Sequence, residues 1–154
     1  NDQLVQRVQA LVSQRLGTPA CAVTWLCFGS EAREEQTLHT DQDNGLWFDN
    51  EAQRPALLRW AEAVNRDLDT LGLSWCSGGI MAGQPACCLT PAEWRSRFLG
   101  WLREPTKNST VRPAGFWLMA ESNALWLGTK PDAMRSLFSS SFTEEYPRDL
   151  SIGP

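Results

Sequence analysis

Two aspartates separated by a single residue, Asp41 and Asp43, carry the clearest chemical signal in the sequence. Alternate residues of a strand point to the same face, so this spacing places two carboxylates side by side. Carboxylate oxygens are the ligands that a hard divalent cation such as Mg²⁺ or Mn²⁺ takes from proteins. The spacing therefore predicts a metal site, with a solvated polar loop as the alternative for a bare pair of aspartates.

The run DQDNG also resembles the first half of a calcium-binding loop. Such a loop needs an oxygen ligand at its fifth position, glycine at its sixth and glutamate at its twelfth. Gly45, Leu46 and Ala52 stand at these three positions. The spacing makes this kind of calcium site a poor candidate.

An apolar run from Cys21 to Phe28 precedes the aspartates and ends in Gly29-Ser30. Its β-branched and aromatic members predict a strand buried on both faces, followed by a tight turn and a helix. Backbone N–H groups and a hydroxyl at such a turn can donate to phosphate oxygens. With Asp41 and Asp43 on the neighbouring strand, the stretch predicts magnesium beside a nucleotide triphosphate, in a two-metal site suited to in-line displacement.

The whole stretch follows a longer pattern, made of Gly29-Ser30, Arg33, Glu35-Gln36, Leu38 and Thr40-Asp41-Gln42-Asp43-Asn44. It resembles the signature G-S-x-G-R-x-E-Q-x-L-x-T-D-Q-D-N of the nucleotidyltransferase family of domain of unknown function 294. That family is related to the protein-PII uridylyltransferase within the DNA polymerase β superfamily. A second block is similar to the family's G-G-V-M-A and A-E-W segments, and consists of Gly78-Gly79-Ile80-Met81-Ala82, Pro85 and Ala92-Glu93-Trp94-Arg95. The resemblance spans roughly residues 20–104.

The resemblance implies an α/β (α+β) fold, with a mixed β-sheet flanked by helices. It implies magnesium at Asp41 and Asp43, which are then the catalytic carboxylates, and a nucleoside triphosphate at Gly29 and Ser30. Arg33 is expected to pair with a phosphate, since its fork geometry suits one, although a surface salt bridge to a neighbouring glutamate is the alternative.

Five further motif residues have supporting roles. Gln36, Thr40 and Asn44 belong to the signature, and Gln36 and Thr40 are expected to fix the loop by hydrogen bonds. Gly79 and Met81 either line the nucleotide pocket or form a turn with a packed methionine.

Two departures from the family pattern separate the function hypotheses. Ala32 replaces a glycine of the family pattern. The family's third metal ligand is expected to be an acid shortly after Arg103, but the segment there, NSTVRPAGFW, contains none. Glu121 and Asp132 are the candidate substitutes, although neither lies in a matching motif. The first hypothesis is an enzyme that transfers a nucleoside monophosphate from ATP or UTP to a hydroxyl, on a protein partner in bacterial signalling. The alternative is a catalytically degenerate module that binds nucleotide or a partner, and a purely structural domain is the third.

Three helices and further short elements are expected to position the site. Apolar residues at spacings of three and four predict helices over residues 4–16 and 55–71, with Gly17 and Gly72 at their ends, and Thr90 with Glu93 forms a capping box that begins a helix extending to about Arg103. The two apolar stripes are Leu4, Val5, Val8, Leu11, Val12, Leu16 and Leu57, Trp60, Ala61, Val64, Leu68, Leu71.

The remaining segments give weaker signals. Residues 46–48 predict a second strand, residues 73–89 a glycine-rich loop, and residues 115–128 a hairpin turning at 121–123, with a helix as its alternative. Residues 129–138 predict a short helix and residues 139–154 a loose tail. Most of the eight tryptophans are expected in the core.

Length and composition bound the class of protein. A chain of 154 residues suits a single domain, and the net charge of −4 without any block of Lys or Arg argues against a nucleic-acid partner. The five cysteines are an odd number, two of them within the predicted strand at 21–28, so reduced thiols are expected. No apolar run is long enough for a membrane span or a signal peptide, which predicts a cytoplasmic location.

The resemblance also implies a longer parent chain. Members of the family typically lie beside cystathionine-β-synthase-type or cyclic-nucleotide-binding sensor domains. Neither module is present in these 154 residues. The domain is therefore expected to be a fragment of a larger regulatory protein.

Overall fold

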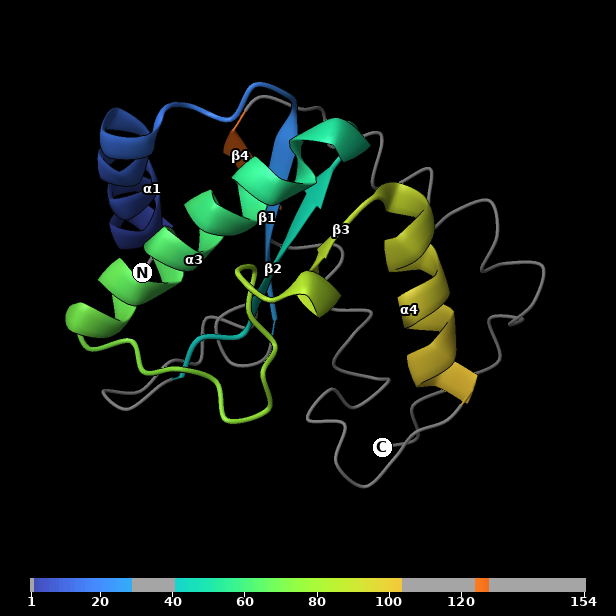
Figure 1. Ribbon diagram of the computed structural model, residues 1–154. Coiled ribbons are helices and arrows are strands. Elements are labelled where there is room, and N and C mark those ends of the chain that lie inside the picture. Colours follow the sequence, from blue (N-terminus) through green and yellow to red (C-terminus); the bar gives the residue numbers. More distant parts are fainter. Residues whose placement is uncertain (1, 29–40, 104–123, 128–154) are drawn as a thin grey trace.

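The computed structural model describes residues 2–28, 41–103 and 124–127 of the chain (Figure 1). The elements in chain order are α1 (Asp2–Leu16), β1 (Val23–Cys27), β2 (Asn44–Phe48), α3 (Arg54–Thr70), β3 (Cys88–Leu89), α4 (Pro91–Arg103) and β4 (Ala124–Leu127). Two 3-10 turns, Glu51–Gln53 and Pro85–Cys87, precede α3 and β3.

The strands form one mixed sheet in the order β3-β2-β1-β4. β1 is antiparallel to both β2 and β4, while β2 and β3 are parallel. β1 lies between two partners and all but one of its residues are buried, which agrees with the nearly continuous apolar run in its sequence. The expected mixed sheet flanked by helices is confirmed.

Helices cover both faces of this sheet. Figure 1 shows α1 and α3 together on one side of the strands and α4 on the other side, next to β3. Gly45 explains the close approach of α4, because a Cβ atom built there would lie 2.6 Å from Cζ2 of Trp94. The Trp94 indole also donates to the carbonyl of Leu46 at 3.0 Å, which fixes α4 against β2.

The main core lies between the sheet and the α1–α3 pair. Trp25 of β1 meets Trp60 of α3 edge to face, with ring centroids 6.1 Å apart. The Trp60 indole donates to Ser13 Oγ at 3.0 Å and so joins α3 to α1. Full burial of one large apolar side chain contributes roughly 1.5–3 kcal/mol, so these two tryptophans help to hold the helices against the sheet.

The start of α4 confirms the predicted capping box. Oε2 of Glu93 accepts the backbone N–H of Thr90 at 2.8 Å and the Thr90 hydroxyl at 2.7 Å. The same oxygen accepts from Arg54 at 2.6 Å, which links the first turn of α4 to the first turn of α3. Local sequence therefore determines where this helix begins.

The predicted apolar stripes were wrong at their outer members. Val5, Val8 and Val12 are buried in α1, whereas Leu11 and Leu16 are 41% and 57% exposed, since the buried face is narrower than the stripe. Leu71 is 56% exposed because α3 ends at Thr70 and the chain reverses at Gly72, whose φ is 98°. Most of the tryptophans were expected in the core, and Trp75, which is 40% exposed, is an exception.

The expectation of a loop over residues 73–89 was also incomplete. This segment contains the 3-10 turn Pro85–Cys87 and the two-residue strand β3, whose Cys88 pairs with Leu46. A strand of two residues has no periodicity to detect, and its partner is far away in sequence. β4 confirms a strand in the second half of the expected hairpin, while its first half, its turn and everything predicted for residues 129–154 lie outside the described residues.

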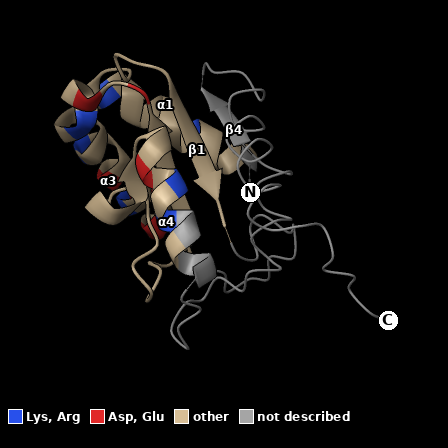
Figure 2. Cartoon of the chain, turned by 90° about the vertical axis from the view of Figure 1, so that its right-hand side faces the viewer, with Lys and Arg blue, Asp and Glu red and all other residues tan. Residues whose placement is uncertain are grey.

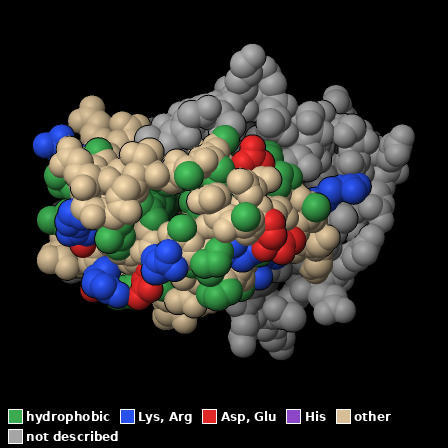
Figure 3. Space-filling model, turned by 45° about the horizontal axis from the view of Figure 1, so that its top comes forward, with side chains coloured by type: hydrophobic (Ala, Val, Ile, Leu, Met, Phe, Trp, Pro, Cys, Tyr) green, Lys and Arg blue, Asp and Glu red, His purple; other side chains and the backbone are tan. Residues whose placement is uncertain are grey.

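The surface carries charges of both signs. Figure 2 shows acidic and basic residues carried by the helices, and on the face in Figure 3 they are interspersed. The five cysteines all lie among the described residues and are reduced thiols, as expected, and four of them are buried. Among the described residues, no helix is long and apolar enough to cross a membrane.

Candidate functional site

The two aspartates lie in an extended segment, residues 41–44, that runs into β2. Its backbone is held from both sides by three hydrogen bonds, Phe28 N–H to the Asp43 carbonyl at 2.7 Å, Gln42 N–H to the Ser74 carbonyl at 2.8 Å and Asn44 N–H to the Ile80 carbonyl at 3.0 Å. Asp41 also forms an isolated parallel bridge with Ser74. The end of β1 on one side and the segment from Ser74 to Ile80 on the other therefore fix the position of the aspartates.

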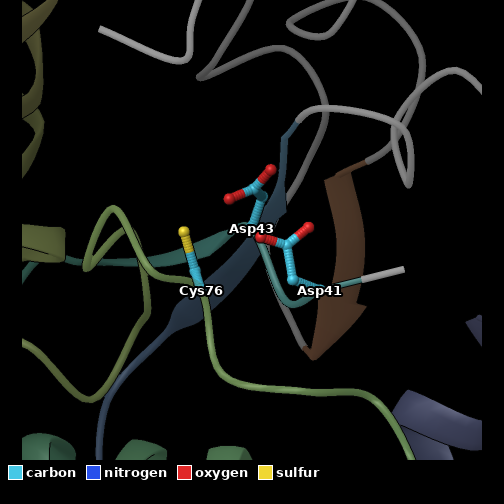
Figure 4. A group of neighbouring side chains, drawn as sticks. All are labelled: Asp41, Asp43 and Cys76. Carbon is cyan, nitrogen blue, oxygen red and sulfur yellow. The ribbon is translucent and has the colours of Figure 1, made fainter. Parts of the chain in front are cut away.

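Three side chains meet at this segment. One oxygen from each of Asp41 and Asp43 and the sulfur of Cys76 all lie within 4.8 Å of one another. Figure 4 shows the two carboxylates beside each other and Cys76 approaching from the neighbouring segment. The closeness of the carboxylates agrees with the D-x-D spacing, whereas Cys76 was not anticipated because it follows Asp43 by more than thirty residues.

The side chain of Asp43 is partly buried. Burial raises the pKa of Asp43, the nearby Asp41 carboxylate raises that pKa further, and a hydrogen bond from the Cys76 thiol opposes the rise. Burial and the contact with Asp43 raise the pKa of Cys76. Oδ1 of Asp43 is buried and has no hydrogen-bond partner among the described residues.

These observations fit a divalent cation. A buried carboxylate oxygen without a partner is costly, and a metal ion that neutralises the charge removes that cost. A second carboxylate lies close enough to share the ion. Mg²⁺ and Mn²⁺ bind carboxylate oxygens, whereas a thiol suits softer metals, so the two aspartates are the expected ligands and Cys76 their neighbour.

The two residues that alternate with the aspartates along this segment turn into the core. Gln42 and Asn44 are each 1% exposed, and both bond to Asn65 of α3. Asn44, expected as a support of the motif, thereby holds the segment from its inner side. Asn65 was missed, because one polar residue beside an apolar helical stripe gives no signal of its partners.

The other predicted nucleotide contacts have different surroundings. Gly79 is exposed in a turn with φ 69°, where its N–H donates to the Cys76 carbonyl at 3.0 Å. Met81 is 4% exposed, so its side chain is packed. Gly29, Ser30, Arg33, Gln36 and Thr40, and the substitute acids Glu121 and Asp132, lie outside the described residues.

An α+β domain with a mixed sheet and paired carboxylates beside its strands is consistent with a nucleotidyltransferase-like fold. Over residues 1–108 the chain matches the family described as "Putative nucleotidyltransferase DUF294". This match covers more than two thirds of the sequence, and the chain belongs to that family. No curated protein and no solved structure gave a match.

Proposed function

We propose that this domain is a Mg²⁺-dependent nucleotidyltransferase that transfers a nucleoside monophosphate from ATP or UTP to a hydroxyl group on a protein partner. The observation that carries the proposal is the grouping of Asp41 and Asp43 beside the strands of a chain from this family. Nucleotidyltransferases generally use divalent metals, and the family implies a nucleoside triphosphate as substrate.

Asp41 and Asp43 would hold the cation, Mg²⁺ or in its place Mn²⁺. A bound divalent ion supplies positive charge that offsets the charge of the triphosphate and of the pyrophosphate leaving group. The partial burial of Asp43 strengthens its attraction for a cation, because electrostatic interactions are less screened where water is excluded.

The phosphates would lie at the end of β1. In the sequence, Gly29 and Ser30 follow Phe28, whose N–H bonds to the Asp43 carbonyl at 2.7 Å. Their backbone N–H groups and the Ser30 hydroxyl would donate to phosphate oxygens, and Arg33 would pair with a phosphate. The exposed backbone of Gly79 would offer a surface for the nucleotide, and the buried Met81 would support the same segment from within.

The physiological setting belongs to the same proposal. We place the domain in the cytoplasm, within a longer chain whose sensor domains, of the cystathionine-β-synthase or cyclic-nucleotide-binding type, control the transfer. The acceptor would then be a signalling protein. Nucleotide binding without transfer is the competing outcome.

The test compares two single substitutions that remove one negative charge each. Asp43→Asn acts at the site, and Asp49→Asn acts on an exposed residue just beyond β2. The full chain is incubated with ATP or UTP labelled on the α-phosphate, with Mg²⁺ and cell lysate as the source of acceptor. We expect Asp43→Asn to lower the labelled product by at least about 100-fold, through loss of a metal ligand, and Asp49→Asn to retain wild-type labelling.

Two results would count against the enzyme. Mg²⁺-dependent nucleotide binding without any labelled product would favour the regulatory binding module. Absence of Mg²⁺-dependent nucleotide binding, measured by calorimetry with the wild-type chain, would exclude both.

A further inference from the structure

One amide lies on the buried face of α3. Asn65 is fully buried, and its neighbours on that face, Ala61, Val64 and Leu68, are buried apolar residues. Burying an amide among apolar side chains is unfavourable unless its donors and acceptor are all used. The hydrogen bonds of Asn65 therefore indicate what this residue does.

Asn65 bonds to two separate segments of the candidate site. Its Nδ2 donates to Gln42 Oε1 at 2.7 Å and to Asn44 Oδ1 at 2.9 Å, both on the segment that carries the aspartates. Its Oδ1 accepts the N–H of Gly83 at 2.9 Å, at the end of the glycine-rich segment. One side chain thus uses both of its donor hydrogens and its acceptor across the site.

The partners of Asn65 are themselves bound to each other and to the surrounding backbone. Asn44 Oδ1 also accepts the N–H of Ala82 at 2.8 Å, which ties the two segments together directly. Nε2 of Gln42 donates to the carbonyls of Asn65 and Leu73 at 2.9 and 2.8 Å. The three amides form a buried network that has little freedom to shift.

We propose that Asn65 is a positioning residue that fixes Asp41 and Asp43 relative to the glycine-rich segment, residues 78–83. The inference rests on the proposed function, since it assigns the geometry of that same metal site. Its basis is the alternation of an extended chain: when Gln42 and Asn44 are held inward, Asp41 and Asp43 must point the other way. Loss of the network would let the aspartates rotate out of alignment without removing either carboxylate.

Close packing around Gly83 supports this role. A Cβ atom built on Gly83 would lie 2.7 Å from Cα and 2.9 Å from the backbone nitrogen of Glu62. The glycine-rich segment therefore rests directly on the backbone of α3, at the turn that carries Asn65. A displacement of the segment from the helix would therefore also disturb its contact with Asn65.

The test must distinguish a loss of positioning from a general loss of stability, and it does so by comparing Asn65 with its neighbour Val64 on the same helix. Asn65→Asp places an acceptor against the oxygens of Gln42 and Asn44, and Asn65→Ser is the milder second variant. Val64→Ala is the control, because Val64 is also fully buried on α3 but belongs to the apolar core. Unfolding in urea ranks the three variants by stability, and near-ultraviolet circular dichroism checks that they are folded.

Two readouts follow for the full chain, with Mn²⁺ alone as the probe. Calorimetry measures Mn²⁺ affinity, which we expect to fall about tenfold or more in the Asn65 variants and to stay within about twofold of wild type in Val64→Ala. Hydrogen exchange followed by NMR measures the amides of Ala82 and Gly83, which should lose protection in the Asn65 variants beyond any loss in Val64→Ala.

The failures of the two proposals are distinguishable. Wild-type Mn²⁺ affinity in a folded Asn65 variant, or an affinity loss that simply follows stability and matches Val64→Ala, would overturn the positioning role alone. Absence of Mn²⁺ binding by the wild-type chain would overturn both this role and the metal site of the proposed function.

Discussion

Two pairs of polar side chains leave the same four-residue segment on opposite sides. Gln42 and Asn44 turn inward, are each 1% exposed and bond to α3 and its neighbouring backbone. Asp41 and Asp43 turn away from that network, and Oδ1 of Asp43 has no partner among the described residues. The inner pair has the features of a structural element, and the outer pair those of a binding site that needs a further ligand.

The largest effect is expected from a substitution in the inner pair, Gln42 and Asn44. Gln42→Leu removes the donor to the carbonyls of Asn65 and Leu73 and the acceptor of the Asn65 amide. Buried groups left without partners cost about 1–3 kcal/mol each, so we expect a loss of about 3 kcal/mol in the free energy of unfolding, measured in urea.

A substitution of the neighbouring Asp43 tests the outer side of the same segment by the same measurement of stability. Because burial raises the pKa of Asp43, its charge at neutral pH disfavours the folded state. Asp43→Asn removes that charge, and we expect unchanged or slightly increased stability. Equal losses for Gln42→Leu and Asp43→Asn would contradict the division into a structural and a binding side.

A second prediction concerns the close approach of the glycine-rich segment to α3. In Gly83→Ala the new Cβ would meet the Glu62 backbone, which cannot rotate away as a side chain can. We expect a loss of about 1–3 kcal/mol, measured by urea unfolding, because the segment must move off the helix and off Asn65.

Gly100→Ala is the matched control for this prediction. Gly100 lies within α4, and among the described residues no atom outside its own helix lies within 4 Å of a Cβ built there. Alanine is a better helix former than glycine, so this variant should gain up to about 1 kcal/mol. A stable Gly83→Ala variant would show that the inner network tolerates displacement of the segment.

Local signals in the sequence located most of the elements that position the site. Helical periodicity located α1 and α3, the Thr90–Glu93 pair located the start of α4, and an apolar run located β1. The D-x-D spacing predicted the closeness of Asp41 and Asp43, because strand alternation is a property of adjacent residues. Each of these inferences needed only a window of a few residues.

What the sequence could not supply depends on contacts between distant residues. β3 exists because Cys88 meets Leu46, and Cys76 joins the aspartates through the fold alone. Asn65 looks like an ordinary polar interruption beside an apolar stripe until its partners on the sheet are known. Tertiary structure decides which distant strands pair and which hydrogen bonds the buried polar groups make, and neither can be read from local propensity.

The smallest effect is expected at Glu93, which makes as many hydrogen bonds as Asn65 but is far less buried. Like Asn65, Glu93 takes part in three of them, but all are accepted by one oxygen of a side chain that is 45% exposed. These contacts, the one from Arg54 above all, lower the pKa of Glu93 from 4.5 to about 2. The unfolded chain therefore binds this proton more readily, so the contribution of Glu93 is complete above about pH 4.5 and is lost as the pH falls toward 2.

Glu93→Gln should therefore cost more stability at pH 5 than at pH 3. Solvent screening keeps the difference at pH 5 below about 1 kcal/mol, against the larger loss expected for the buried Gln42. Urea unfolding of wild type and variant at both pH values measures it, with Glu62→Gln as the control, since Glu62 accepts from Arg66 in a single exposed pair. A Glu93→Gln loss as large as that of Gln42→Leu would mean that the number of bonds, rather than their burial, decides what a polar group contributes in this fold.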